Sequence, residues 1–286
     1  MKKLIILACT ALLAGCVTQK AAPDAAQPSP EQDRQSFVGY FQQRFPDVQL
    51  ADYADGAYAL PVNAAAREEW QTIEEFPPYE LAIGEGESLW NTPFKNGKTY
   101  QDCFPYKLED GIKQHYPQWS EERKMVLTLE LALNECREAN GEKPLGWKKG
   151  KIASLSAYVG YMSRGKVQNM PAPNSSGALA AYAAGRQHYY AKRGQLNMSC
   201  ADCHVYNSGM RVRSEVLSPS LGHTTHFPVY RSKWGEMGTL HRRFGGCNEQ
   251  VRAKAFKPQG AEYRNLEYFL AYMNNGMAIN SPGARK

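Results

Sequence analysis

The sequence predicts a mainly α-helical fold of two tandem domains, because helical periodicity is frequent, strand alternation is sparse and the chain repeats itself. Apolar residues recur at helical spacing in six stretches, with Gly- and Pro-rich loops between them. These stretches lie near residues 65–75, 120–140, 151–164, 178–194, 239–255 and 262–275. A length of 286 residues accommodates two domains of ordinary size.

The internal repeat is visible when the sequence is shifted by 111 residues against itself. Cys136 then falls on Cys247, and residues 155–165 fall on residues 266–276 without a gap. A Leu, a Tyr, a Met and a Gly are identical in the two segments. Each half thus ends in a similar amphipathic helix that follows a cysteine, which indicates two related domains.

The composition is that of an ordinary globular protein and excludes two classes of function. The chain is 43% apolar and 22% charged, with a net charge of +6 spread along its length. No stripe of basic residues interleaved with aromatic ones is present, so a nucleic-acid function gets no support. The only long apolar run, residues 4–15, is too short to span a bilayer, which excludes a polytopic membrane protein.

The first residues predict an export signal. Two lysines and an apolar stretch precede the small-residue cleavage site Leu13-Ala14-Gly15-Cys16. The pattern is similar to a bacterial lipoprotein signal, in which Cys16 is lipidated; the alternative is a plain secretory signal, and either exports the chain to an oxidising compartment. We expect a periplasmic protein that is lipid-anchored through Cys16, and Val17 favours the outer membrane.

The segment Cys200-Ala201-Asp202-Cys203-His204 has the C-x-x-C-H spacing of covalent c-type haem attachment. Two thioethers attach the haem, and the adjacent imidazole binds the iron as proximal ligand. A zinc site would need a second Cys/His pair at ligand spacing. The sequence therefore predicts one covalent haem c, held by Cys200, Cys203 and His204.

The first half contains a decayed copy of this motif. A shift of 100 residues places Asp102-Cys103-Phe104 on Asp202-Cys203-His204. Tyr100 stands where the first cysteine would be, and Phe104 replaces the histidine. Because phenylalanine cannot bind iron, we expect the first domain to carry no haem.

Together these patterns define four segments and a mainly α fold of two tandem cytochrome-c-like domains related by an internal repeat. Residues 1–15 are a lipoprotein signal peptide, and residues 16–38 are an Ala-, Pro- and Gln-rich tether. Residues 39–168 form an N-terminal cytochrome-c-like domain without haem. Residues 169–286 form the haem-binding cytochrome c domain.

Cys103 and Cys136 have no role in export or haem attachment, because Cys9 lies in the signal, Cys16 is the predicted lipidation site, and Cys200 and Cys203 belong to the haem motif. Cys136 lies on the apolar stripe of a helix that Ser120 could cap. The two residues are either separately buried thiols or a disulfide, and an oxidising compartment favours the disulfide.

Cys247 lies in a basic segment after the haem motif. Arg243 is four residues before it, on the same face if the segment is helical, and Arg242 is five before. A guanidinium there would lower the thiol pKa and bind an oxyanion. Gly245 and Gly246 could break the helix, and a solvated basic turn beside a buried thiol is the alternative.

The sequence patterns described so far leave two kinds of residue as candidates for the sixth ligand of the haem iron, methionine and Cys247. Electron carriers usually use methionine, and four are available: Met210, Met237, Met273 and Met277. A thiolate from Cys247 would instead stabilise ferric iron and suit sulfur chemistry.

Three further histidines are open candidates. His223 and His226 in the segment His-Thr-Thr-His could line the haem crevice or bind a copper ion. His241, two residues before Arg243, could enter the site around Cys247.

At these residues the chain resembles the SoxA family of L-cysteine S-thiosulfotransferase subunits. The resemblance covers roughly residues 40–280, with C-x-x-C-H followed by an R-x-x-x-C-N motif whose cysteine lies 43 residues after His204. It implies iron ligation by His204 and by Cys247, a cysteine that occurs as a persulfide in the family. It also implies that Arg243 is the active-site arginine.

The resemblance is to the monohaem branch of that family, because Tyr100 and Phe104 depart from the two-haem pattern. In this branch a disulfide, here Cys103 with Cys136, stands in place of the first haem.

The activity that the resemblance implies is an oxidative S–S condensation. Thiosulfate joins the cysteine thiol of a carrier protein (SoxYZ), giving a cysteine S-thiosulfonate, and two electrons pass to a small haem partner, SoxX. Two alternatives stay open: a thiosulfate dehydrogenase that forms tetrathionate, and a passive monohaem electron-transfer cytochrome c.

Overall fold

The computed structural model describes residues 28–286. The signal peptide, Cys9, Cys16 and residues 16–27 of the predicted tether lie outside the described residues. Within residues 28–286, no helix has the length and apolar character needed to cross a membrane.

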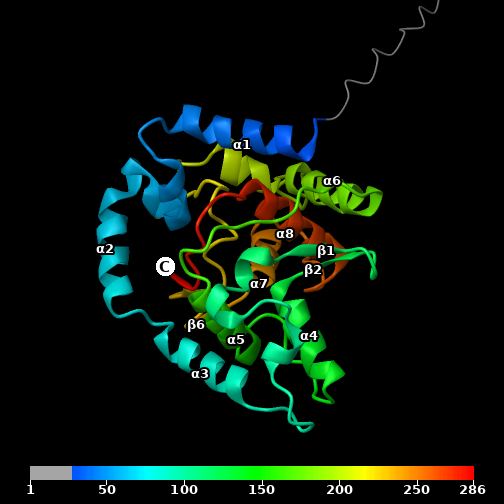
Figure 1. The fold of residues 1–286 in the computed structure, drawn as a ribbon. Helices are drawn as coiled ribbons and strands as arrows, with labels where there is room; N and C mark the ends of the chain where they lie inside the picture. The colour runs from blue at the N-terminus through cyan, green and yellow to red at the C-terminus, as the bar shows by residue number, and fades with distance from the viewer. Residues whose placement is uncertain (1–27) are drawn as a thin grey trace, which may run out of the picture.

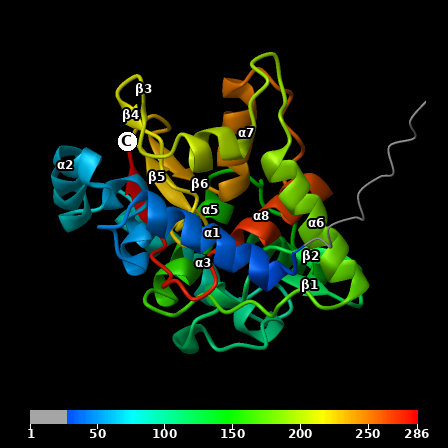
Figure 2. The same ribbon diagram turned by 90° about the horizontal axis from the view of Figure 1, so that it is seen from above.

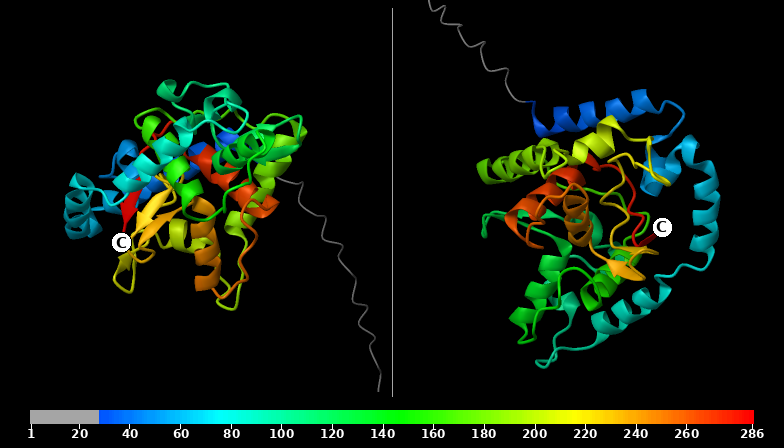
Figure 3. Two further views of the ribbon diagram at one scale, coloured as in Figure 1. Left: turned by 90° about the horizontal axis from the view of Figure 1, so that it is seen from below. Right: turned by 180° about the vertical axis from the view of Figure 1, so that it is seen from behind.

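Helices dominate the fold, as the sequence predicted (Figure 1). The eight α-helices described are α1 (Pro30–Arg44), α2 (Ala64–Glu75), α3 (Glu80–Asn91), α4 (Leu129–Ala139), α5 (Lys151–Met162), α6 (Ser176–Tyr190), α7 (Leu240–Gln250) and α8 (Ala261–Met273). Short helical turns at Leu50–Ala59, Pro61–Asn63, Tyr100–Cys103, Leu108–Asp110, Lys113–His115 and Asp202–Tyr206 connect them. Helices α2 and α3 run along the outside of the molecule, and α8 lies near its centre (Figures 1 and 3).

In the described part of the chain, seven short strands form three small sheets. The strands are β1 (Gln118–Ser120), β2 (Met125–Leu127), β3 (Arg211–Val212), β4 (Glu215–Val216), β5 (Val229–Arg231), β6 (Glu236–Gly238) and β7 (Gly283–Arg285). β1 pairs with β2 and β3 with β4, both antiparallel. In the third sheet, β5 is central, antiparallel to β6 and parallel to β7 (Figure 3). Because β6 ends one residue before the N-cap of α7, this sheet positions the start of that helix.

The prediction of one helix over residues 120–140 is wrong in its first part. Ser120 ends β1, and the β1–β2 hairpin turns through Lys124, whose φ of 51° is incompatible with a right-handed helix. Helix α4 starts only at Leu129, where the Thr128 side chain accepts a hydrogen bond from the Leu131 amide. Thr128 is therefore the N-cap, and Ser120 is not.

The predicted tether is wrong for residues 30–38, which belong to α1. Ser29 and Gln32 form a capping box, and Phe37 and Phe41 are buried in a core with α6 and α8. Asp33 fixes α1 to α6 by accepting from Tyr182 (2.8 Å) and from Arg186 (2.6 Å). Burial of two aromatic rings and these polar contacts hold a segment that has little apolar periodicity of its own.

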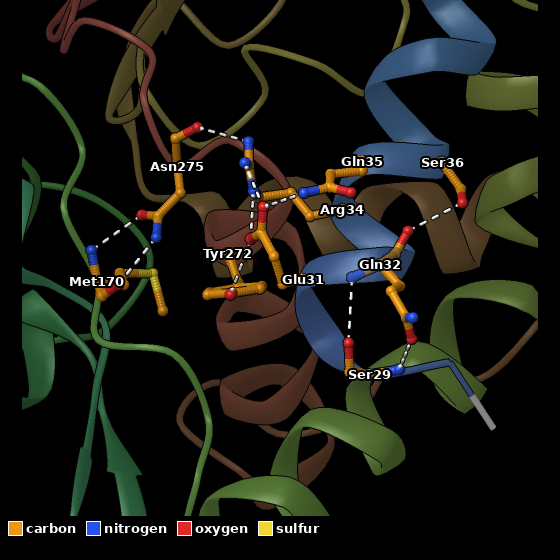
Figure 4. Close-up of polar contacts among 9 residues, drawn as sticks. All are labelled: Ser29, Glu31, Gln32, Arg34, Gln35, Ser36, Met170, Tyr272 and Asn275. Carbon is orange, nitrogen blue, oxygen red and sulfur yellow. Dashed lines mark hydrogen bonds and ion pairs between the residues drawn. The ribbon is translucent and has the colours of Figure 1, made fainter. Parts of the chain in front are cut away.

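A second set of polar contacts joins α1 to the end of α8 (Figure 4). Arg34 forms an ion pair with Glu31 (2.7 Å) and also donates to the carbonyl of Asn275 (3.4 Å). Tyr272 donates to Glu31 (3.2 Å), and Asn275 exchanges two hydrogen bonds with the backbone of Met170. Helix α1 is thus part of the second half of the molecule.

The two largest hydrophobic clusters of residues 28–286 underlie the two halves. One core surrounds α1, α6 and α8 and includes Tyr53, Leu60 and Val205. The other lies between α3, α4 and α5 and includes Trp90. Since residues 37–60 contribute to the first of these, the predicted first domain of residues 39–168 does not pack as one unit. The internal repeat stays a prediction.

The cysteines of the first half form the predicted disulfide, Cys103–Cys136, with a Cα–Cα distance of 5.7 Å. At the two other positions of the decayed motif, Tyr100 and Phe104 are buried. Their rings lie 5.6 and 5.7 Å from that of Trp90. Aromatic packing and a disulfide therefore stabilise this core together.

We expect Gly185→Ala to destabilise the second half strongly. Helices α6 and α8 approach so closely that a Cβ at Gly185 would lie 2.0 Å from the carbonyl oxygen of Asn265. Because backbone cannot move away cheaply, overpacking should cost about 3 kcal/mol of the free energy of unfolding. Urea unfolding followed by circular dichroism measures this cost. The matched control is Gly39→Ala in α1, where a Cβ meets nothing within 4 Å and should stabilise by roughly 0.5–1 kcal/mol; equal effects at both positions would contradict this packing argument.

Candidate functional site

The C-x-x-C-H motif opens a single irregular helical turn. The Asp202 carboxylate accepts from the amide of Ser199 (2.7 Å), which fixes the start of the turn, and the following segment Asp202–Tyr206 is a short π-helix. Cys200 and Cys203 are both free thiols in the structure. Burial raises the pKa of Cys200 to about 12 and that of Cys203 above its usual range. The neighbouring Cys247 raises both pKa values further, so the three thiols lie close together.

The imidazole of His204 is held in one orientation. Its Nδ1 donates to the carbonyl of Ser218 (2.9 Å), and the Ser220 amide donates to the His204 carbonyl (3.0 Å). A proton on Nδ1 leaves the Nε2 lone pair free, which is the arrangement an iron ligand needs.

Cys247 lies on α7, which is continuous across Gly245 and Gly246. The Thr239 side chain caps the helix by accepting from the Arg242 amide. Arg243 and Cys247 are therefore one turn apart on one face, as the helical prediction required, and the alternative of a basic turn is wrong.

The surroundings of Cys247 favour its thiolate. Burial raises the pKa of this thiol, but the charge of Arg243, the neighbouring His204 and the charge of Arg231 outweigh it and lower the pKa to about 7. The structure thus brings His204, Cys247 and Arg243 together, from the turn after α6 and from α7. Figure 2 shows α7 beside the sheet of β5 and β6.

Arg231 is a residue of this site that the sequence did not reveal. It ends β5, and burial together with the positive charge of Arg243 lowers its pKa to about 10. A lone arginine in a short strand gives no signal of this kind, because its position depends on how the strand packs against α7.

Arg242 and His241 point to other partners. Arg242 forms an ion pair with Glu236 (3.2 Å) and lies 4.3 Å over the ring of Trp234. His241 is buried with Nε2 3.0 Å from Glu267, and its Nδ1 accepts from the Gln259 amide (3.0 Å). Neither side chain joins Cys247, because each of them turns away from the face that holds Arg243.

Of the two histidines in His-Thr-Thr-His, His223 lies at the site. Its ring centroid is 4.5 Å from that of His204, and its Nε2 is 2.7 Å from the hydroxyl of Ser218. Burial lowers the pKa of His223 well below its usual value, so the ring is neutral. His226 instead bonds to the carbonyl of Gly222 (2.7 Å). Across residues 28–286, no group of three or more His, Cys, Asp or Glu side chains is arranged to hold a metal ion, and copper gets no support.

The methionines differ from Cys247 in their surroundings. Met210 is exposed, and Met237 packs with Tyr79 in a separate small cluster. Met273 and Met277 are buried in the core of α1, α6 and α8. By contrast, Cys247 lies near enough to His204 for the imidazole to lower the pKa of its thiol.

The donor set fits a covalent haem c. Two free thiols stand three residues apart for the thioethers, and His204 presents an unprotonated Nε2. Cys247 adds a thiol that is easily deprotonated, which is the form that binds iron or attacks sulfur.

Comparisons with known proteins agree with this chemistry. A family model described as "SoxA/TsdA, cytochrome c domain" matches residues 85–167, which lie in the first half. The L-cysteine S-thiosulfotransferase subunit SoxA of Allochromatium vinosum is 56% identical over 289 residues, with 100% of both chains covered. The SoxA subunit of Chlorobaculum tepidum is 52% identical over 254 residues, covering 89% of this chain and 87% of the relative.

A solved structure shows the same fold. The crystal structure of SoxXA from P. pantotrophus superposes with a TM-score of 0.69 at 27% identity, covering 77% of this chain and 84% of that chain. The expectation of a mainly helical, cytochrome-c-like protein is confirmed. The identity over the whole chain with a curated SoxA subunit also settles the resemblance seen in the motifs: this chain belongs to the SoxA family.

Proposed function

We propose that this chain is the catalytic subunit that conjugates thiosulfate oxidatively to a cysteine thiol of a SoxYZ-like carrier protein. Its relatives are named L-cysteine S-thiosulfotransferase subunits. The observation that carries the proposal is the position of Cys247, one helical turn from Arg243 and beside the histidine of C-x-x-C-H. This position supports a site that combines a nucleophilic sulfur, a positive charge and the haem motif.

The reaction forms one S–S bond and releases two electrons. The carrier thiol and thiosulfate (S₂O₃²⁻) give a cysteine S-thiosulfonate (R–S–S–SO₃⁻), one proton and two electrons. Cys247, as thiolate or persulfide, holds the sulfur that is transferred, and Arg243 neutralises the sulfonate end. A haem bound here would accept the electrons one at a time.

Cys200, Cys203 and His204 hold that single haem c in our proposal. The thioether cysteines fix its position, while the Ser218 carbonyl keeps the His204 ring oriented toward the iron. Cys247 would be the second iron ligand, so the proposal does not need a methionine.

A small SoxX-like cytochrome c is the proposed partner, in a heterodimer. The structural neighbour is a SoxXA complex, and a two-electron reaction on a one-electron centre needs a second acceptor. We also propose a periplasmic location with a lipid anchor at Cys16 and the outer membrane as destination. The lipoprotein-like leader supports this location.

A tetrathionate-forming dehydrogenase is the second candidate, because the matching family model covers TsdA as well as SoxA. That enzyme would join two thiosulfates into tetrathionate, also with release of two electrons, and would need no carrier.

Carrier dependence separates the two candidates. The holo-complex is mixed with thiosulfate and an oxidised cytochrome acceptor, with carrier, without carrier, or with a carrier whose acceptor cysteine is serine. We expect acceptor reduction and a thiosulfonate adduct, seen by mass spectrometry, only with the intact carrier. Tetrathionate formation without carrier would favour the dehydrogenase. If neither the adduct nor tetrathionate forms, a passive electron carrier would be favoured.

Arg243→Gln should lower kcat/KM for thiosulfate by roughly 10²-fold, the usual loss when one charged donor to a developing anion is removed. The matched control is Arg242→Gln, on the same helix and with the same change of charge, but engaged with Glu236 and Trp234. We expect the control to stay within about threefold of the wild type, since Arg242 is engaged with Glu236 and Trp234 and does not face Cys247. Equal losses of kcat/KM in the two variants would show that the net charge of the helix, and not a specific contact of Arg243 with thiosulfate, determines the rate.

A further inference from the structure

We infer that Arg231 and Arg243 together form a two-guanidinium site that binds the sulfonate end of free thiosulfate beside Cys247. This inference deepens the proposed function and rests on it for the identity of the anion. It assigns a binding role to a strand residue that no sequence motif contains.

The packing of β5 directs Arg231 toward α7. Val229 packs in one cluster with Leu240 of α7, with Phe244 of α7 against it, whereas Tyr230 packs on the opposite side, against the cluster around Tyr79. Because side chains alternate along a strand, Arg231 shares the face of Val229. On α7 the residues Leu240, Arg243, Phe244 and Cys247 follow one another at helical spacing on one face. The strand face and the helix face therefore meet with both arginines next to Cys247.

Electrostatic coupling agrees with this placement. Arg243 lowers the pKa of Arg231, Cys247 raises it, and Arg231 in turn lowers the pKa of Cys247. Glu215 and Tyr58 also raise the pKa of Arg231, but neither forms an ion pair or a hydrogen bond with it in the part of the chain that is described.

Both guanidinium groups keep unused donors. Arg231 donates one Nη to the carbonyl of Lys286 (2.9 Å) and lies 5.6 Å from the Trp234 ring, but its Nε is buried without a hydrogen-bond partner. For Arg243, no side-chain hydrogen bond or ion pair is found within residues 28–286. A buried N–H without an acceptor is costly unless a ligand supplies one. Two charged groups with free N–H donors match the three oxygens of a sulfonate.

Neighbouring arginines face carboxylates instead. Arg242 is paired with Glu236. Arg285, beside Arg231 in the sheet, also has a buried Nη without a partner, but it lies 5.3 Å from the Tyr58 ring and 5.5 Å from the Trp70 ring, and the charges of Glu74 and Asp55 compensate it. Arg231 and Arg243 thus differ from these two in facing a thiol rather than a carboxylate.

Protection of Cys247 from alkylation tests the site without turnover. The holo-complex is kept reduced so that no conjugation occurs, and Cys247 is alkylated with the neutral reagent iodoacetamide at increasing thiosulfate concentration. Peptide mass spectrometry locates the label. Each variant is compared with its own rate without thiosulfate, so a change in the thiolate fraction of Cys247 cancels.

We expect Arg231→Gln to raise the half-protecting thiosulfate concentration about tenfold or more, the scale of one charge-assisted hydrogen bond. Arg242→Gln, the matched control, should leave it unchanged. Arg231→Lys keeps the charge and should recover part of the protection, and it is the variant to compare if Arg231→Gln does not load haem. If thiosulfate protects Cys247 from alkylation in Arg231→Gln as well as in the wild type, the inference is overturned.

Steady-state kinetics distinguish the source of the sulfonate. In the conjugation assay, Arg231→Gln should raise KM for thiosulfate and leave KM for the carrier unchanged. A rise confined to the carrier would overturn the assignment to free thiosulfate, because the sulfonate would then be that of the carrier adduct. If the wild type conjugates nothing, the proposed function fails, whereas the protection experiment still decides on the anion site.

Discussion

Cys247→Ala is expected to reduce conjugation by at least about 10³-fold, because it removes the sulfur that holds the transferred group. Alanine is the residue most compatible with a helix, so α7 should persist. The other haem-holding residues, Cys200, Cys203 and His204, are untouched, and covalent haem should be retained. Acceptor reduction with the carrier present measures the loss, and the pyridine haemochrome spectrum measures haem content.

The comparison variant is Cys247→Ser, which keeps the size of the side chain but not the sulfur. We expect it to be as inactive as the alanine variant, since a hydroxyl at neutral pH neither forms a persulfide nor exchanges sulfur. Turnover within tenfold of the wild type in either variant would remove Cys247 from the mechanism.

Removing the Cys103–Cys136 disulfide, as the double variant with alanine at both positions, is expected to lower the free energy of unfolding by roughly 3–4 kcal/mol. The bond closes a loop with a sequence separation of 33 residues, and the chain-entropy estimate for such a loop is of this size. It lies in the core of α3, α4 and α5 rather than beside Cys247. Urea unfolding in air measures the loss.

Activity provides the control for that experiment. Well below its melting temperature the double variant should conjugate thiosulfate at a rate within about twofold of the wild type, because no residue of the proposed site contacts the disulfide. A stability equal to that of the wild type would show that Trp90 and its aromatic neighbours hold this core without the bond.

The central residues of the site could be predicted from the sequence because their chemistry is local. The C-x-x-C-H spacing fits one covalent group, and the four-residue spacing of Arg243 and Cys247 has a meaning as soon as α7 is a helix. The capping threonine before α7 and the continuous helical turn confirmed that spacing. Arg231 could not be found in this way, because only the packing of β5 against α7 brings it to Cys247.

The errors in the fold have a similar cause. Helix α1 has few apolar residues, and its stability depends on Phe37 and Phe41 reaching the core formed by α6 and α8. Its capping box was present in the sequence, but the Pro- and Gln-rich composition argued for a tether. In the β1–β2 hairpin, a run of charged residues typical of a helix start is interrupted by the positive φ of Lys124. A local pattern does not reveal such a turn.

The central claim is that Cys247 would bind the haem iron as its second protein ligand beside His204, and the low-temperature EPR and visible spectra of the air-oxidised mature protein test it most directly. We predict a low-spin ferric signal of the histidine/thiolate type that is lost in Cys247→Ala. A methionine-to-iron charge-transfer band in the wild type would contradict the claim, because Cys247 would then not be the ligand and the proposed active site would fall with it.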